Sequence, residues 1–141
     1  MVDYIIGAPS IEAHTTGGKY LQDGIDDFTM AQLLYPGDVR AHIFVSWLHP
    51  FKEQRLVVVG SKGMISFEDS SKDKNICFYN KRIEFENGIP QKVEQPDEII
   101  DYVRSQPLNN ELQYFIDNLD HKIKIADGQS GLEVVRVLEK A

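Results

Sequence analysis

Apolar and polar residues alternate, or form short apolar blocks, over the first two thirds of the chain. A period of two residues predicts β-strands. We expect strands at residues 11–15, 27–34, 39–47, 55–60, 64–68, 76–79 and 82–86. Turn residues at 36–38, 61–63 and 87–88 predict hairpins, the first two joining neighbouring strands that run antiparallel.

The last third changes its period. Leu112, Phe115, Ile116 and Leu119 follow the i, i+3, i+4, i+7 spacing of a helix with one apolar side. A second helix is expected from Asp127, whose carboxylate can cap the free amides of the first turn. A short helix is also expected within residues 97–104. Strands followed by helices predict an α+β fold, in which the helices pack on one face of a predominantly antiparallel open sheet.

The strand at 39–47 indicates what that sheet presents on each face. Val39, Ala41, Ile43, Val45 and Trp47 share one side and are expected against the helices. The opposite, open side carries a mixture of polar and aromatic residues, which is typical of a surface that meets a partner or a ligand. These residues are Arg40, His42, Phe44 and Ser46. A solvated sheet with one exposed phenylalanine is the alternative.

Charge and composition narrow the class of protein. A formal charge of −7 with no cluster of basic residues disfavours nucleic acid as a partner. A hydrophobic fraction of 42% predicts a folded chain, and no apolar run is long enough to cross a membrane. The single cysteine, Cys77, cannot form an internal disulfide, and no signal peptide is seen, so a cytoplasmic location is expected.

Motifs for common cofactors are absent from the sequence. The ten glycines form neither a G-x-G-x-x-G dinucleotide motif nor a Walker A loop. The four histidines lie on separate elements without the spacing of a metal site, and isolated histidines of this kind are more often structural. We therefore predict no catalytic residue, no cofactor-binding residue and no metal ligand within this chain.

The segment 49–55 combines several kinds of polar side chain in a bend between two apolar strands. Lys52 and Arg55 could hold a phosphate or a carboxylate, since arginine offers two parallel donors. Trp47 and His49 lie next to them in the sequence, so these four residues are the predicted substrate contacts. The alternative is a solvent-exposed turn in which Glu53 pairs with Lys52 or Arg55, worth at most about 1 kcal/mol.

The segments 17–22 (GGKYLQ) and 39–60 (VRAHIFVSWLHPFKEQRLVVVG) resemble the C-terminal domain of the Gfo/Idh/MocA oxidoreductases. They resemble in particular the subgroup that oxidises the 3-position of UDP-N-acetyl amino sugars and their uronic acids. The end of the chain is similar to that family's terminal helices, with Pro107, Glu111, Phe115 and the Asp127-Gly128 pair in place. The resemblance covers nearly the whole sequence.

This resemblance implies a fold of the glucose-fructose oxidoreductase C-terminal type and one substrate-binding and oligomerisation domain over residues 1–141. In that family a separate N-terminal Rossmann domain binds NAD(P). The family's catalytic lysine and histidine lie in motifs that precede this domain, and neither motif occurs here. The Rossmann domain is therefore expected to be absent from this chain, which would be catalytically inactive alone, and the opening residues 3–7 resemble the tail of the preceding helix.

The expected partners are a Rossmann domain in a full-length enzyme and further copies of the chain. Arg40, His42, Phe44 and Ser46 on the open face are the predicted dimer contacts, in an arrangement where each copy uses the same patch. Two other functions stay open: a binding or scaffold module of this fold without redox activity, and a small sugar isomerase or lyase. A fold alone does not decide between them.

Overall fold

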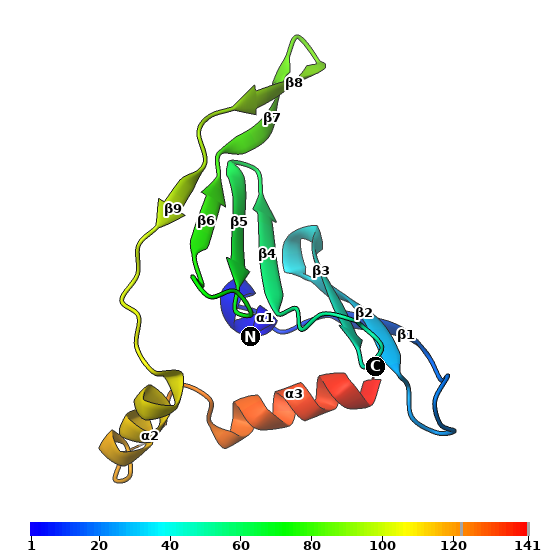
Figure 1. Cartoon of the computed structure of the whole chain (residues 1–141), viewed down its shortest axis with the longest axis vertical. Helices are drawn as coiled ribbons and strands as arrows, with labels where there is room; N and C mark the ends of the chain where they lie inside the picture. Colours follow the sequence, from blue (N-terminus) through cyan, green and yellow to red (C-terminus); the bar gives the residue numbers. More distant parts are fainter. Residues whose placement is uncertain (122, 141) are drawn as a thin grey trace. The chain divides into compact units, whose positions relative to one another are not determined.

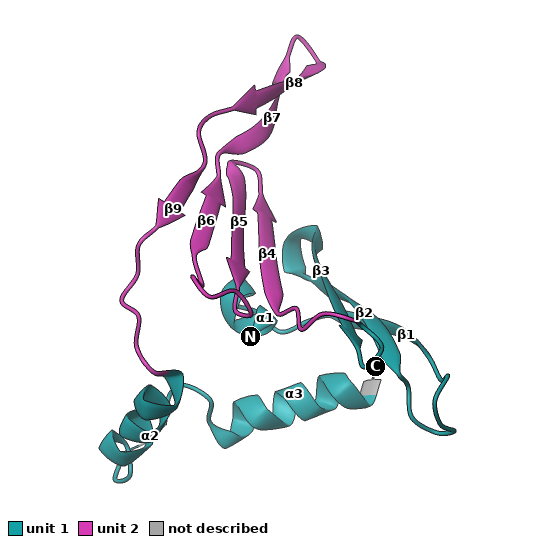
Figure 2. Ribbon diagram, viewed as in Figure 1, with its two compact units in different colours: residues 1–49, 107–141 teal, residues 50–106 magenta. Residues whose placement is uncertain are grey.

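The structure is a computed structural model that describes residues 1–121 and 123–140. It divides into two compact units, which Figure 2 shows in different colours. Unit 1 consists of residues 1–49 and 107–141, and unit 2 consists of residues 50–106. The units are described separately below.

Unit 1 is built on a three-stranded antiparallel sheet in the order β1-β2-β3, which is labelled in Figure 1. The strands are β1 (Glu12–Gly18), β2 (Phe28–Tyr35) and β3 (Val39–Ser46), with the short 3₁₀ turn η1 (Pro36–Asp38) between the last two. The helices are α1 (Val2–Ile6), α2 (Pro107–Asp117) and α3 (Gly128–Lys140). The predicted hairpin at residues 36–38 is confirmed, with Gly37 in the left-handed conformation at φ 74°.

The two faces of this sheet differ in burial. Leu33 and Tyr35 are almost fully buried, and both lie on the side of the sheet that carries Ala41. Helix α1 meets this side, because the hydroxyl of Tyr35 donates a hydrogen bond of 2.6 Å to Oδ1 of Asp3. We call this side the covered face. The sequence predicted five residues of 39–47 against the helices, but only Ala41 is half-buried. The other four are exposed: Val39, Ile43, Val45 and Trp47.

Unit 2 contains a four-stranded antiparallel sheet and a separate hairpin. The sheet has the order β4-β5-β6-β9, and the hairpin is β7-β8. Their bounds are β4 (Arg55–Gly60), β5 (Gly63–Glu68), β6 (Ile76–Tyr79), β7 (Lys81–Glu86), β8 (Ile89–Glu94) and β9 (Glu98–Ile100). One face of the sheet is apolar and the other is mixed, as the alternation of side chains requires.

Two sequence predictions in unit 2 were incomplete or wrong. The short helix expected within residues 97–104 is instead strand β9, in which Ile99 and Ile100 pair with Cys77 and Ile76. Strand β8 was not predicted, although the turn at 87–88 that leads into it was. Strand β9 is ordered by pairing with the distant strand β6, which local sequence does not reveal. Strand β8 pairs with the adjacent strand β7, and Pro90 within it weakens the strand signal of the sequence.

Two further predictions of the fold agree with the structure. The α+β class with mainly antiparallel sheets is confirmed. Helix α3 begins directly after Asp127, whose Oδ1 accepts the backbone amide of Ser130 at 2.8 Å, as expected for a cap. In the described part of the chain, no helix has the length and apolar content needed to span a membrane.

Candidate functional site

The face of the unit 1 sheet opposite the covered face carries the predicted dimer residues. The registers of β1, β2 and β3 place four rows of three residues side by side on it. The rows are Glu12, Leu34 and Arg40; His14, Gln32 and His42; Thr16, Met30 and Phe44; and Gly18, Phe28 and Ser46. We call these twelve residues the open face.

The exposed fractions of its side chains show that the open face is accessible in the single chain. Met30 and Phe44, neighbours in one row, are 50% and 54% exposed. The guanidinium of Arg40 donates to Oδ1 of Asp38 at 2.8 Å. Apolar side chains that are half exposed beside charged and polar ones are typical of a surface that is covered in an assembly.

The four predicted substrate residues divide between the two units. Trp47 and His49 belong to unit 1, and Lys52 and Arg55 belong to unit 2. The ring of His49 packs edge-on against Phe44, with centroids 6.5 Å apart, so this histidine lies next to the open face. Trp47 is 79% exposed, and its backbone amide donates to the carbonyl oxygen of Asp27 at 2.9 Å.

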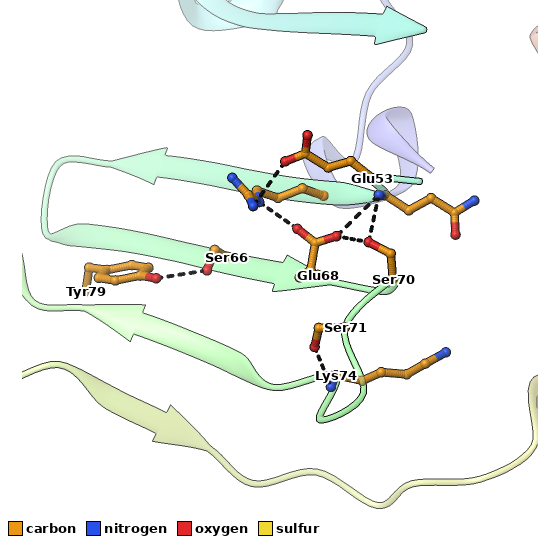
Figure 3. A network of polar contacts seen from close by, with 9 residues as sticks. Glu53, Ser66, Glu68, Ser70, Ser71, Lys74 and Tyr79 are labelled. Atoms are coloured by element: carbon orange, nitrogen blue, oxygen red, sulfur yellow. Dashed lines mark hydrogen bonds and ion pairs between the residues drawn. The ribbon is translucent and has the colours of Figure 1, made fainter. Parts of the chain in front are cut away.

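In unit 2, Lys52 and Arg55 line one hollow of about 370 Å³. Arg55 is bound there by two carboxylates: Nη2 lies 3.0 Å from Glu53, and Nε lies 2.7 Å from Glu68 (Figure 3). The ion pair that the sequence offered as an alternative is thus present for Arg55. The carboxylates, Glu68 before Glu53, raise the pKa of the guanidinium, which keeps Arg55 charged.

Glu68 is the centre of this network. Its carboxylate accepts the hydroxyl of Ser70, the guanidinium of Arg55 and the backbone amide of Gln54 (Figure 3). These hydrogen bonds, with that of Ser70 first, lower the pKa of Glu68 below its ordinary value. Among the described residues, none forms a hydrogen bond or ion pair with Lys52, so its ammonium is the free cation of this hollow.

The mixed face of the unit 2 sheet forms a second hollow, of about 630 Å³, which the sequence did not predict. Ser66 donates to the hydroxyl of Tyr79 at 3.4 Å, as Figure 3 shows, and the Lys81 ammonium lies 5.6 Å from the centre of the Tyr79 ring. Period-two alternation places Ser66, Cys77 and Tyr79 on one face. The register that brings them together depends on pairing between β5 and β6.

A second residue that sequence reasoning missed is Asp27, which is 2% exposed. Its Oδ2 accepts the backbone amides of Tyr20 and Leu21, the second at 2.7 Å. Its carbonyl oxygen accepts the amide of Trp47 and the hydroxyl of Ser46. Asp27 therefore fixes both the β1–β2 loop and the end of β3, next to Trp47. An aspartate that follows a Gly-rich loop and precedes a strand is the sequence signal that could have identified it.

The residues of this chain do not fit a dinucleotide. All strand pairings in the described residues are antiparallel, and no Gly-rich turn joins a strand to a helix. A dinucleotide site of the Rossmann type needs parallel strands and such a turn. Within residues 1–121 and 123–140, no group of three or more His, Cys, Asp or Glu side chains could hold a metal ion.

Comparisons with known proteins show a partial family match and a shared fold. Residues 1–66 match the model of the GFO/IDH/MocA C-terminal domain. The structure is similar to UDP-N-acetylglucosamine 3-dehydrogenase GnnA from Acidithiobacillus ferrooxidans, with a TM-score of 0.72 and 15% identity over 95% of this chain. The chain spans 40% of the length of that protein. No curated protein sequence matches this chain significantly. The match of residues 1–66 to this family's C-terminal domain and the shared fold agree with the resemblance found in the sequence.

Proposed function

We propose that this chain is the substrate-binding and oligomerisation domain of an NAD(P)-dependent oxidoreductase that acts on a nucleotide sugar or a related sugar. The observation that carries the proposal is the family match of residues 1–66. The likeness to a UDP-N-acetylglucosamine 3-dehydrogenase favours a nucleotide sugar as the substrate class. Both units would act together as one domain, in the cytoplasm.

The domain would hold the substrate and would not carry out the redox step. Its residues do not fit a dinucleotide, so NAD(P) would bind to a Rossmann domain elsewhere in the full-length enzyme. The part that this chain plays in catalysis is then to position the sugar, which lowers the entropic barrier to reaction. Alone it is expected to be inactive.

The contact with substrate is assigned to Trp47, His49, Lys52 and Arg55. Of the two cations, Lys52 is the better candidate for a diphosphate, because Arg55 is already bound by Glu53 and Glu68. An ammonium without a carboxylate partner retains its full attraction for a phosphate. The exposed ring of Trp47 is suited to stacking on a base or a sugar.

The test is a nuclear magnetic resonance titration of the chain with UDP-N-acetylglucosamine. We expect saturable shifts around Lys52, and we expect Lys52→Ala to weaken binding about tenfold or more, the loss of a charged hydrogen bond. Lys62→Ala, in the β4–β5 turn, is the matched control and should leave binding unchanged. Equal affinity of the Lys52→Ala variant and the unchanged chain would refute the assignment of Lys52.

Oligomerisation is assigned to the open face, through Arg40, His42, Phe44 and Ser46. Arg40→Glu reverses the charge at its edge and should reduce the sedimenting mass toward that of one 16.1 kDa chain. An unchanged mass would count against this placement.

The alternative is a binding or scaffold module of the same fold that needs no redox partner. Such a module would carry out its binding or scaffold function in full without a Rossmann domain. If joining the chain to a dinucleotide domain of this family gives no sugar-dependent reduction of NAD(P), the module is favoured over the enzyme domain.

A further inference from the structure

The hollow on the mixed face of the unit 2 sheet adjoins the smaller hollow that contains Lys52. Arg55, Glu68 and Ser71 line both of them, so the two hollows share a wall. Their volumes are about 630 Å³ and 370 Å³. Pockets for drug-sized ligands measure roughly 300–1,000 Å³, and a nucleotide sugar is larger than most such ligands. A nucleotide sugar bound at Lys52 would therefore extend beyond the smaller hollow, and the larger hollow offers adjoining room in the same unit.

The strand registers arrange the side chains of the larger hollow in three rows. The rows are Arg55 and Glu68; Val57, Ser66 and Cys77; and Met64 and Tyr79. Each row lies two residues beyond the one before it, which is about 7 Å along an antiparallel strand. The first row borders the hollow of Lys52, and the third row lies farthest from it.

The chemistry of the lining changes from the first row to the third. The loop between β5 and β6 brings Asp73 to the side of the first row, and no described residue forms a hydrogen bond or ion pair with its carboxylate. The second row is a largely apolar floor. Beyond the third row lies the ammonium of Lys81, 5.6 Å from the centre of the Tyr79 ring. It contacts Asp97 at 3.4 Å, which leaves two of its three N–H donors for other partners.

We propose that the larger hollow holds the nucleoside of a uridine diphosphate ligand whose phosphates lie at Lys52. This inference rests on the proposed function and names the part of the nucleotide sugar that unit 2 encloses. The order of the rows follows the order of groups in the nucleotide, which are phosphate, ribose and base. The ribose hydroxyls donate to Asp73, as they do to carboxylates in other nucleotide sites.

The base lies flat on the second row, because every base has an apolar face. Uracil has two ring carbonyl groups, which accept hydrogen bonds, and one N–H group between them. The hydroxyl of Tyr79 accepts from Ser66 and can donate its own proton to one carbonyl (Figure 3). The ammonium of Lys81 donates to the other carbonyl.

The sugar is the competing occupant of this hollow. In the proposed enzyme the sugar has to meet a nicotinamide held by another domain, whereas the nucleoside takes no part in the reaction and can stay enclosed. Binding energy from a part of the substrate that does not react serves to position the part that does. Donors at the edge of an apolar floor also suit the carbonyls of a flat base better than the hydroxyls around a sugar ring.

Two fragments of UDP-N-acetylglucosamine, each with one phosphate, distinguish these placements. The full chain is titrated with uridine monophosphate and, separately, with N-acetylglucosamine 1-phosphate, and both titrations are followed by nuclear magnetic resonance. We expect the uridine fragment to shift the signals of Ser66, Cys77 and Tyr79, and we expect the sugar fragment to leave them unchanged. Shifts at these residues with the sugar fragment alone would overturn the placement of the nucleoside.

Asp73→Asn tests the contact with ribose. The variant should bind uridine diphosphate about tenfold more weakly, because it loses hydrogen bonds to a charged group. It should lose much less affinity for 2′-deoxyuridine diphosphate, which lacks one of the hydroxyl partners. Glu86→Gln removes an exposed carboxylate at the β7–β8 turn and is the matched control, with both affinities unchanged. Equal losses for the two ligands in Asp73→Asn would contradict the ribose contact.

Lys81→Met tests the contact with the base. Uracil presents a carbonyl group where cytosine presents an amino group, so the unchanged chain should prefer uridine diphosphate to cytidine diphosphate about tenfold. Methionine keeps an unbranched side chain but has no donor, so the variant should lose most of this preference. A preference of the same size in Lys81→Met would contradict the base contact.

The outcomes separate this inference from the proposed function. Saturation with uridine diphosphate that shifts the signals of Lys52 but not those of Tyr79 overturns the nucleoside placement and leaves the substrate-binding role in place. A chain that binds neither uridine diphosphate nor UDP-N-acetylglucosamine overturns both. Shifts at Tyr79, together with the ribose-dependent loss in Asp73→Asn, support a nucleoside site on the mixed face of unit 2.

Discussion

At the scale of single residues, the presence of glycine at positions 17 and 18 is explained by neighbouring atoms that lie close to the backbone there. A Cβ atom on Gly17 would lie 2.9 Å from the carbonyl oxygen of Phe28 and 2.5 Å from Oδ2 of Asp26. A Cβ atom on Gly18 would meet the ring of Phe28, which stacks on Tyr20. Both glycines leave room for neighbouring atoms, so close packing accounts for glycine at these positions.

We expect Gly17→Ala to destabilise the chain by about 1–3 kcal/mol, because backbone at the partner strand cannot move aside easily. Gly131→Ala is the control: nothing lies within 4 Å of its Cβ position in α3, and alanine should stabilise that helix by about 0.5–1 kcal/mol. Urea denaturation measures both. A Gly17→Ala variant as stable as the original chain would refute the close-approach explanation.

Asp27 gives a second test at this scale. Asp27→Ala removes the acceptor for the amides of Tyr20 and Leu21 and should cost about 1–3 kcal/mol. Hydrogen exchange of those two amides should accelerate with it. Asp23→Ala, in the same loop and exposed, is the matched control. Unchanged exchange at both amides after loss of the carboxylate would contradict the assigned contact.

The ionisation of Tyr35 is expected to make the stability of unit 1 depend on pH. Burial, and then the hydrogen bond to Asp3, raise the pKa of its hydroxyl well above the ordinary value of 10. The neutral form is thus favoured in the folded state, so this contribution to stability is complete below pH 10 and is lost as the pH rises through the raised pKa.

An alkaline titration followed by tyrosinate absorbance tests this. One of the six tyrosines should ionise later than the others, and its ionisation should coincide with loss of structure. Tyr35→Phe should remove that late step. A late step that persists in Tyr35→Phe belongs to another tyrosine and would contradict the explanation.

At the scale of elements, the sequence was sufficient to predict the features that depend on neighbouring residues. The hairpin turns at 36–38, 61–63 and 87–88 and the cap at Asp127 depend on residues within a few positions of each other, and all were predicted correctly. Strand β9 was missed because Ile99 and Ile100 are ordered by pairing with β6, about 23 residues away. The hollow around Tyr79 was not predicted for the same reason, because it depends on pairing between strands.

In the candidate site, too, features that depend on one strand were predicted, and contacts between strands were not. Alternation along β3 was enough to place Arg40, His42, Phe44 and Ser46 on one face, because the period is local. The two carboxylates that bind Arg55 could not both be predicted, because Glu68 comes from β5 and reaches Arg55 through the β4–β5 register. Sequence therefore identifies a face more readily than it identifies ion-pair partners.

The cap of α3 provides the test at the scale of elements. Asp127→Ala removes the acceptor for the Ser130 amide and should destabilise the helix by about 1 kcal/mol. Asp127→Asn keeps an oxygen acceptor and should retain most of that stability. Circular dichroism during denaturation measures the difference. Equal losses in the two variants would contradict capping as the cause.

At the scale of the whole molecule, we propose a domain for binding and assembly. The family match of residues 1–66, the antiparallel sheets and the mixed open face are consistent with that role. In the proposed enzyme a Rossmann domain would carry out the redox step, because the described residues of this chain do not fit a dinucleotide. Substrate and subunit contacts are the properties that this part would contribute to an enzyme.

Calorimetric titration of the chain with NAD⁺, in the presence of saturating UDP-N-acetylglucosamine, tests this division of labour most directly. We expect no heat of binding for NAD⁺ and no formation of NADH in the calorimeter. Saturable binding of one NAD⁺ per chain, or reduction of the nicotinamide by the chain alone, would contradict it.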